Sequence, residues 1–245
     1  MNKWIKIRYQ QAILVVMASL LLSACATTPQ PLEIRSNVDA LATSDAQGKR
    51  HFVILPGNKD IKEQDLQFIE FKAYVEKVLS SRGFVRVDTL QDGDVVLFLS
   101  YGVGEPQTYQ YSYDVPGWTY PGFYPYYRRY WYYPMSPYYT QRVQSYSVYR
   151  RYLSLEAFDM GAYLQHKTPQ QLWKINVQSR GLSNDLRLAF PYMVAAMQPY
   201  IGSNTGHMVT VDVDEFDPLL KDILLSNPNP VTPVLPQQEK TSSSP

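Results

Sequence analysis

The sequence Asp92-Gly93-Asp94-Val95-Val96-Leu97-Phe98-Leu99 opens the most apolar run that follows the N-terminal segment of this chain. Between Val95 and Leu99, apolar and polar residues do not alternate. Such a run is typical of a strand that is covered on both faces and lies inside a sheet. We therefore expect a central strand here, and the segments on either side of it predict the rest of the fold.

Upstream, the sequence predicts a strand, a helix and a short second strand. His51–Leu55 is a short apolar run that a Pro-Gly pair closes. Asp60 followed by Glu63 indicates a capping box at a helix start, and Gly83 is expected to end that helix in a left-handed conformation. Residues 84–87 then form a short strand. Apolar residues at three- and four-residue spacing predict one buried helix face: Phe68, Phe71, Val75, Val78 and Leu79.

Downstream, alternating apolar and polar residues predict strands over Val143–Ala157 and 173–177. Asp185–Ile201 is helical in character, and its two prolines are expected to divide it or to lie in a first turn. A last strand over His207–Val213 and a helix over Asp214–Leu225 follow. This order predicts an α+β domain with a mainly antiparallel sheet and helices packed on one face.

The N-terminus has the features of an export signal. Three basic residues among the first eight precede the apolar run Ala12–Leu22, whose 11 residues are too few for a membrane-spanning helix, which needs ~20. Leu22-Ser23-Ala24-Cys25 then resembles the bacterial lipoprotein box, in which the cysteine is acylated and becomes the first residue of the mature protein. Ala26 is not the Asp of an inner-membrane retention signal, so it indicates the outer membrane. The alternative is an ordinary signal peptide that ends near a cysteine.

These patterns predict four segments. Residues 1–24 are the lipoprotein signal peptide, and residues 25–50 are the lipidated cysteine with a flexible tether. Residues 51–225 form the α+β domain, which we expect to face the periplasm. Residues 226–245 contain five prolines and a run of serines and are expected to be a disordered tail.

Several of these motifs together resemble one bacterial family. They are the lipoprotein signal, the helix end Val78–Phe84, the segment Asp92–Val96 and the Leu172-Trp173 strand. In this combination the chain is similar to domain-of-unknown-function family 4136 over roughly residues 50–205. The resemblance implies a bacterial envelope lipoprotein with no assigned activity, and the family pattern offers no catalytic residues to carry over.

A tyrosine- and proline-rich segment at residues 106–139 interrupts the domain. It contains 12 of the chain's 21 tyrosines and six of its 18 prolines. Prolines at this density exclude a helix or a central strand, so we expect a long hairpin insertion. At its start, tyrosines alternate with polar residues, as in an extended edge strand. The candidate binding residues are Tyr113, Trp118, Tyr120, Phe123, Tyr126, Tyr127, Arg128, Arg129, Tyr130, Trp131, Tyr132 and Tyr133.

Two interpretations of this segment remain open. Tyr and Trp offer large rigid contact areas, and Arg adds charge-assisted hydrogen bonds, so the segment fits a recognition surface. Its ligand would be another envelope protein, a glycan or the lipid headgroup layer. The alternative is a low-complexity loop whose rings pack on one another and on the edge of the sheet.

Composition and motifs exclude several functional classes. Without the three basic residues of the signal, 20 basic residues face 22 acidic ones, which argues against nucleic-acid binding. One cysteine and three scattered histidines predict no disulfide framework, metal site or cofactor. The acidic cluster Asp212, Asp214 and Glu215 fits a helix N-terminus, with Asp214 as cap, better than a calcium site. Arg150 and Arg151 place one charge on each face of a strand.

The sequence therefore predicts a non-enzymatic, outer-membrane-anchored lipoprotein that binds a partner or organises the envelope through its aromatic segment. Cys25 is its lipidation site and its attachment to the membrane. One alternative is a glycan- or peptidoglycan-binding module that uses the same rings. Another is a hydrolase whose residues come together only in space, because no catalytic motif is visible in the chain.

Overall fold

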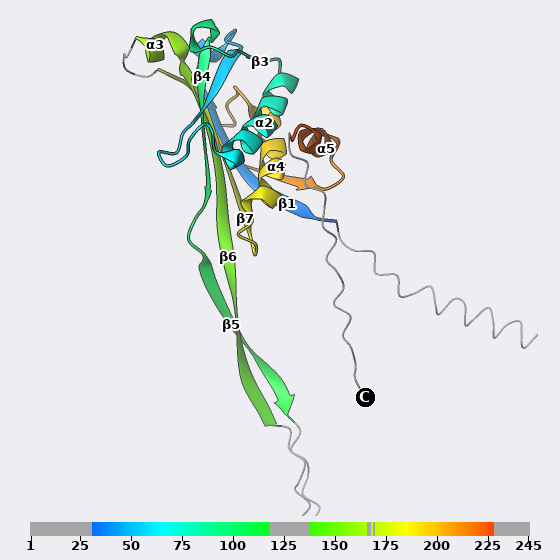
Figure 1. The fold of residues 1–245 in the computed structure, drawn as a ribbon. Helices are drawn as coiled ribbons and strands as arrows, with labels where there is room; N and C mark the ends of the chain where they lie inside the picture. Colours follow the sequence, from blue (N-terminus) through cyan, green and yellow to red (C-terminus); the bar gives the residue numbers. More distant parts are fainter. Residues whose placement is uncertain (1–30, 118–137, 166–167, 169, 228–245) are drawn as a thin grey trace, which may run out of the picture. The chain divides into compact units, whose positions relative to one another are not determined.

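The computed structural model describes residues 31–117, 138–165, 168 and 170–227 (Figure 1). The strands are β1 (Glu33–Ala42), β2 (His51–Pro56), β3 (Val85–Arg86), β4 (Val95–Val103), β5 (Gln107–Gly117), β6 (Tyr138–Asp159), β7 (Gln171–Gly181) and β8 (Val209–Asp214). The α-helices are α2 (Leu66–Ser81), α3 (Met160–Leu164), α4 (Leu186–Met197) and α5 (Pro218–Leu225). Short 3-10 helices cover Ser44–Ala46, Leu90–Asp92 and Gln198–Tyr200.

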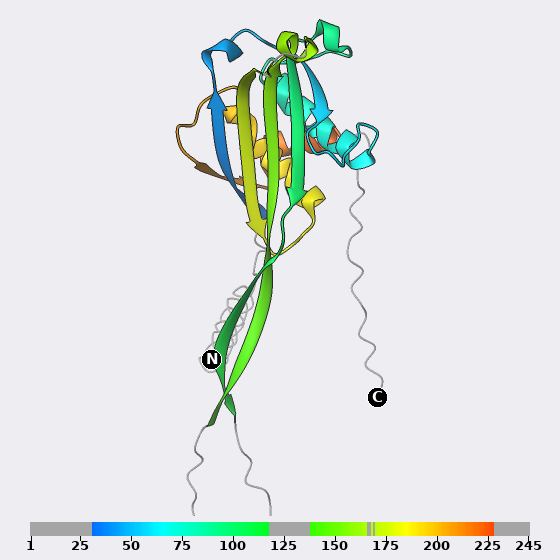
Figure 2. The same cartoon turned by 90° about the vertical axis from the view of Figure 1, so that its left-hand side faces the viewer.

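The strands form one mixed sheet in the order β3-β2-β4-β6-β7-β1-β8, and β5 pairs with β6 outside that order. β2 pairs in parallel with β3 and β4, whereas every other pair of neighbours is antiparallel. Helices α2, α4 and α5 lie on one side of the sheet, as Figures 1 and 2 show in two orientations. The predicted α+β class with a mainly antiparallel sheet is confirmed.

β4 is the central strand that its apolar run predicts. It pairs with β2 on one side and with β6 on the other. Val95, Leu97 and Leu99 point into the main core, where each is at most 1% exposed. Val96 is fully buried on the other face. Burial on both faces explains why this run lacks alternation.

The helical layer supplies the other half of the core. All five residues of the predicted α2 face are buried. Phe71 of α2 stacks on Phe190 of α4, with ring centroids 3.8 Å apart and planes 5° from parallel. α4 in turn contacts α5 and the strands β1, β6, β7 and β8. Gly83 follows α2 with φ +80°, which confirms the predicted left-handed end of this helix.

The structure corrects the starts of two helices. The predicted capping box of Asp60 and Glu63 is wrong, because α2 begins only after Asp65, whose carboxylate accepts a hydrogen bond from the backbone of Lys62. The predicted cap Asp214 is also wrong for α5. Asp217 occupies that position and accepts hydrogen bonds from two backbone amides of the first turn. Asp residues are frequent before both helices, so sequence spacing alone does not select the cap.

The structure also corrects the predicted tether over residues 25–50. β1 begins at Glu33 and lies inside the sheet, between β7 and β8. Ile34, Ser36, Val38 and Ala40 are buried at every second position, which is the two-residue period of a strand. Polar residues between them gave this segment the composition of a linker. The folded domain therefore starts about 18 residues before the predicted boundary at residue 51.

α4 runs without a break through a proline that we expected to divide it or to lie in its first turn. Pro191 is the sixth of its 12 residues and is buried. A proline at this position removes one helical hydrogen bond. Ten of the 12 residues of α4 are buried, so packing against the sheet and the other helices holds the helix together.

Candidate functional site

β5 and the first half of β6 form a two-stranded antiparallel ribbon. Residues 107–117 pair with residues 138–148, and we call these two stretches the ribbon. β6 joins β7 only from Tyr149 onward. Within the described residues, therefore, no third strand pairs with the ribbon, which extends beyond the end of β7 (Figures 1 and 2). The connection between its strands, residues 118–137, lies outside the described residues, so the predicted hairpin stays a prediction.

One side of the ribbon is covered by tyrosines, which we call the tyrosine face: Tyr109, Tyr111, Tyr113 and Tyr146. The first three alternate along β5, and Tyr146 lies directly opposite Tyr109 on β6. The rings of Tyr109 and Tyr146 stack with centroids 5.6 Å apart, and Tyr111 lies 5.9 Å from Tyr113 and 6.3 Å from Tyr146. Each side chain is 42–49% exposed. The rings contact one another, but no layer of the described protein covers them.

The opposite side of the ribbon is mainly polar. Thr108, Gln110 and Ser112 occupy this side of β5, and Ser145 and Ser147 lie on the same side of β6. The hydroxyls of Thr108 and Ser147 are 3.4 Å apart. Val143 and Tyr139 also lie on this side, each 66% exposed, so the side is mainly and not wholly polar. Neighbouring residues of a strand point to opposite faces, which separates this side from the tyrosine face.

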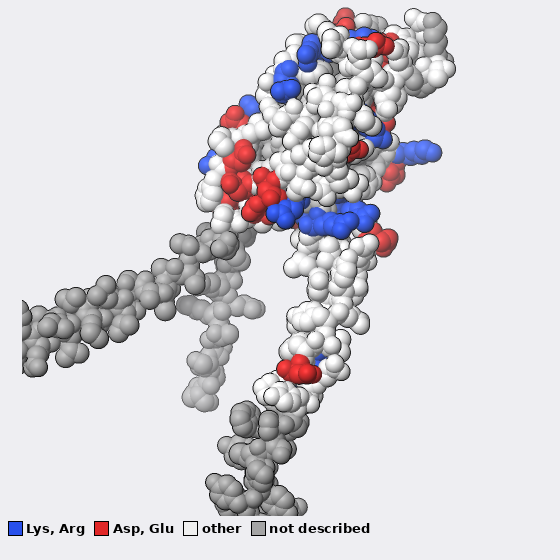
Figure 3. Space-filling model, turned by 180° about the vertical axis from the view of Figure 1, so that it is seen from behind, with Lys and Arg blue, Asp and Glu red and all other residues white. Residues whose placement is uncertain are grey.

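The ribbon carries little charge. Within its described residues, Asp114 and Arg142 are the charged side chains. Figure 3 shows this uncoloured surface, and it shows Lys and Arg gathered at the end of the sheet from which the ribbon extends. There Arg150 lies directly opposite Arg180 on the neighbouring strand, and both are exposed.

The ribbon includes one of the predicted binding residues. Tyr113 lies on the tyrosine face, and the predicted alternation at the start of the segment is confirmed as β5. Cys25, the predicted lipidation site, lies outside the described residues. So do the other predicted binding residues: Trp118, Tyr120, Phe123, Tyr126, Tyr127, Arg128, Arg129, Tyr130, Trp131, Tyr132 and Tyr133. Tyr146 was not predicted, because only the strand register shows that it faces Tyr109.

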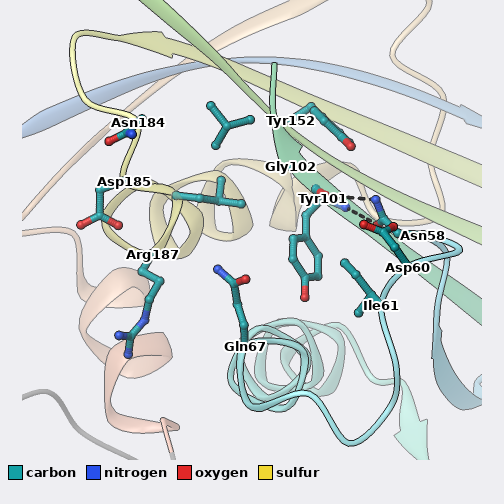
Figure 4. A pocket seen from close by; sticks show the side chains of 12 residues that line it. Asn58, Asp60, Ile61, Gln67, Tyr101, Gly102, Tyr152, Asn184, Asp185 and Arg187 are labelled. Carbon is teal, nitrogen blue, oxygen red and sulfur yellow. Dashed lines mark hydrogen bonds between the residues drawn. The ribbon is translucent and has the colours of Figure 1, made fainter. Parts of the chain in front are cut away.

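A hollow of about 700 Å³ lies between α2, the start of α4, the end of β4 and Tyr152 of β6 (Figure 4). Tyr101 lies at its centre, between Gln67 and Asn58. The Asn58 side chain bonds the Tyr101 backbone at both its N–H (3.0 Å) and its carbonyl (3.3 Å). Burial raises the pKa of Tyr101 to about 12. The carboxylates of Asp60 and Asp185 also line the hollow.

A second cavity of about 430 Å³ lies between α2, α4 and α5 and contains a buried polar network. Glu70 Oε1 accepts hydrogen bonds from the Tyr74 hydroxyl (3.1 Å) and the Asn227 amide (3.3 Å). Arg187 pairs with the other Glu70 oxygen at 2.9 Å. Burial raises the pKa of Tyr74 to about 12. These hydrogen bonds and this ion pair connect the three helices, so we assign the network a structural role.

Arg151 is a buried cation in the core. It is 4% exposed, and its Nη2 donates to the Ser179 hydroxyl at 3.2 Å. Its Nε has no hydrogen-bond partner, and no carboxylate within the described residues forms an ion pair with it. Burial lowers the pKa of this guanidinium, and the charge of Asp185 partly offsets that effect. As predicted, the two adjacent arginines lie on opposite faces of the strand: Arg151 is buried, and Arg150 is exposed to solvent.

Asp212 and Asp214 of the acidic cluster interact with neighbouring groups of the same chain. Arg35 forms a bidentate pair with Asp212 at 2.7 and 2.8 Å, which lowers the pKa of that carboxylate. Asp214 accepts a hydrogen bond from the backbone N–H of Phe216 at 2.7 Å. Among the described residues, no group of three or more His, Cys, Asp or Glu side chains is arranged to hold a metal ion. None of the helices in this part of the chain is long and apolar enough to cross a bilayer.

Comparison with known proteins finds similarity to solved structures, and it is distant. No family model and no curated protein matches the chain. Among solved structures, it is similar to a PDZ domain protein from Parabacteroides distasonis, with a TM-score of 0.37 and 14% identity. The match covers 81% of this chain and 42% of the other, so this chain spans less than half of that protein. At this level the similarity carries no conclusion about fold or function.

Proposed function

We propose that this chain is a non-enzymatic, outer-membrane-anchored lipoprotein that binds another envelope protein through the tyrosine face of its ribbon. Its domain would face the periplasm, and Cys25 would carry the lipid. The anchor is inferred from the N-terminal sequence, and the resemblance to domain-of-unknown-function family 4136 is part of the same proposal. The observation that carries the binding function is the tyrosine face itself.

The tyrosine face fits a protein-binding surface for two physical reasons. Four stacked or neighbouring rings give a large rigid contact area, because a tyrosine has few rotatable bonds to immobilise on binding. Each ring also keeps a hydroxyl that can hydrogen-bond to a partner. Rings that are 42–49% exposed still have apolar area to bury.

The decisive experiment compares the two sides of the same strand. A variant with Tyr109, Tyr111 and Tyr113 replaced by serine should lose crosslinked partners from bacterial envelopes. The matched control replaces Thr108, Gln110 and Ser112 by alanine on the polar side and should keep them. Equal recovery of the same partners with both variants would exclude the tyrosine face as the binding site.

The lipid anchor has its own test. Cells that express the wild-type chain should incorporate radioactive palmitate into it, and Cys25→Ala should abolish the labelling. An unlabelled wild-type protein that still starts at its first methionine would refute the anchor. This result would leave the test of the tyrosine face intact.

A second candidate function, glycan or peptidoglycan binding, is favoured by the hollow beside Tyr101. Asn184, Gln67 and the carboxylates offer several hydrogen-bonding groups next to the Tyr152 ring, a combination that suits a hydroxyl-rich ligand. Sedimentation with purified sacculi distinguishes the two candidates. Binding that is lost in Asn184→Ala and kept in the tyrosine-face variant would support the glycan candidate.

A further inference from the structure

Within the part of the chain that the structure describes, the ribbon has two free edges, because each of its strands pairs with one neighbour over residues 107–117 and 138–148. Backbone groups of a strand point alternately to its two sides, so about half of the N–H and C=O groups of each strand point away from the ribbon. An edge of this kind is a template for pairing with another strand.

Other edges in this protein are protected, but the ribbon is not. The main sheet ends in β3, which has only two residues, and in β8, which carries Asp212 and Asp214. Short edge strands and charged edges are the usual means of preventing pairing. The ribbon strands have 11 paired residues each, with one charge per strand, and are rich in tyrosine, threonine and serine. An isolated two-stranded ribbon is also only marginally stable in water.

A second copy of this chain offers a free β5 edge that can pair with the free β6 edge of the first copy. If two ribbons lie side by side and point the same way, β6 of one copy is antiparallel to β5 of the next. In the register found within one chain, Tyr146 would face Tyr109 of the second copy, and Gln144 would face Tyr111. Within the chain the Tyr111 hydroxyl donates its one proton to Gln144 Oε1 at 2.8 Å. Across the two copies the Gln144 amide N–H would therefore donate to the Tyr111 oxygen, which can still accept.

The charges are compatible with this arrangement. In the same register, Arg142 would face Tyr113 of the second copy, and Asp114 would face Gln141. No two like charges would lie opposite each other, a placement that destabilises a pair of strands. By contrast, an unrelated partner would have to reproduce this pattern of residues.

We propose that β6 of one copy pairs through its free edge with β5 of a second copy, extending the ribbon into a four-stranded sheet. This inference goes beyond the proposed function, because it concerns the edges of the ribbon rather than its tyrosine face. The outer edges of that sheet stay free, so further copies can add in the same way.

Disulfide trapping in the full-length chain tests this register. Two differently tagged copies are co-expressed, one with Ser147→Cys and the other with Thr108→Cys, and then oxidised in their membranes. Directly opposite residues lie within disulfide reach. We expect a disulfide-linked dimer that carries both tags. The matched control replaces Thr108→Cys by Ser112→Cys, about 13 Å further along the strand, and should give at least fivefold less dimer.

Two further measurements make every outcome informative. A single chain with both Thr108→Cys and Ser147→Cys should form an internal disulfide, which shows that the two thiols react when they are opposite. If that internal disulfide forms, two results overturn the proposal. One is that no dimer appears, and the other is that the Thr108→Cys and Ser112→Cys mixtures give equal amounts of dimer. A dimer of Ser147→Cys with itself would indicate β6–β6 pairing and would also overturn it. These substitutions lie on the polar side, so the tyrosine-face experiment is independent of them.

Discussion

Replacing Arg151 by methionine should stabilise the domain. Its guanidinium is 4% exposed and has one hydrogen bond, to Ser179, and no ion pair with a described carboxylate. Removing a cation from water costs several kcal/mol, and a single neutral hydroxyl offsets little of that cost. Methionine has a similar length and no charge, and it adapts its shape to irregular spaces in a core.

The size of the effect follows from two opposing contributions. Exchanging buried charged groups for apolar ones of similar volume is neutral or stabilising by about 1–4 kcal/mol. The Ser179 hydroxyl would lose its partner, which costs about 1–2 kcal/mol. These two ranges centre on a net gain of about 1 kcal/mol. In a domain of this size, this gain raises Tm by about 2–4 °C.

Urea unfolding followed by circular dichroism measures this change directly. The wild type and Arg151→Met should have the same slope, with the midpoint of the variant about 0.5–1 M higher. Arg150→Met is the matched control, because Arg150 is exposed on the opposite face of the same strand, and it should change stability by less than about 0.5 kcal/mol. A loss of more than about 1 kcal/mol in Arg151→Met would refute the reasoning. It would mean that the attraction to Asp185 exceeds the cost of burial.

Three further substitutions test other parts of the domain. Phe71→Ala removes a fully buried ring and should cost about 3–5 kcal/mol by urea unfolding. Tyr101→Phe tests a pH dependence: the folded-state pKa of about 12 lies above the ordinary value, so its contribution to stability is present below pH 10 and is lost as the pH rises towards 12. Between pH 9 and 11.5 the wild type should therefore lose about 1–2 kcal/mol more stability than Tyr101→Phe. Asp94→Ala should cost about 1–3 kcal/mol, because this carboxylate accepts hydrogen bonds from two backbone amides before and at the start of β2; an unchanged unfolding midpoint would contradict this role.

Local patterns in the sequence predicted the elements whose burial is regular. The unbroken apolar run of β4 and the single buried face of α2 both depend on neighbouring residues, and both are confirmed. β1 was missed because polar residues such as Ser36 are typical of a linker, although Ser36 is fully buried here. Only pairing with β7, far along the chain, shows that this segment is a strand.

The candidate site was predictable to a smaller extent for the same reason. Alternation placed Tyr113 on an extended strand, but its neighbours across the ribbon depend on the register between β5 and β6. Neither the distance along the chain nor the composition determines that register. The helix caps failed in a different way, since several Asp residues precede each helix and hydrogen-bond geometry alone selects one.

The position of β1 determines the order in which the protein can fold. Glu33 pairs with Asp214, and Ser36 pairs with both Ser179 and Val211, so the earliest strand needs the last ones. During synthesis, β1 emerges before both strands with which it pairs, and it must wait for them until residue 214 is available. Contacts between residues so distant in sequence slow folding, and an unpaired strand is prone to aggregation. This protein should therefore depend on chaperones until its C-terminal half has been synthesised.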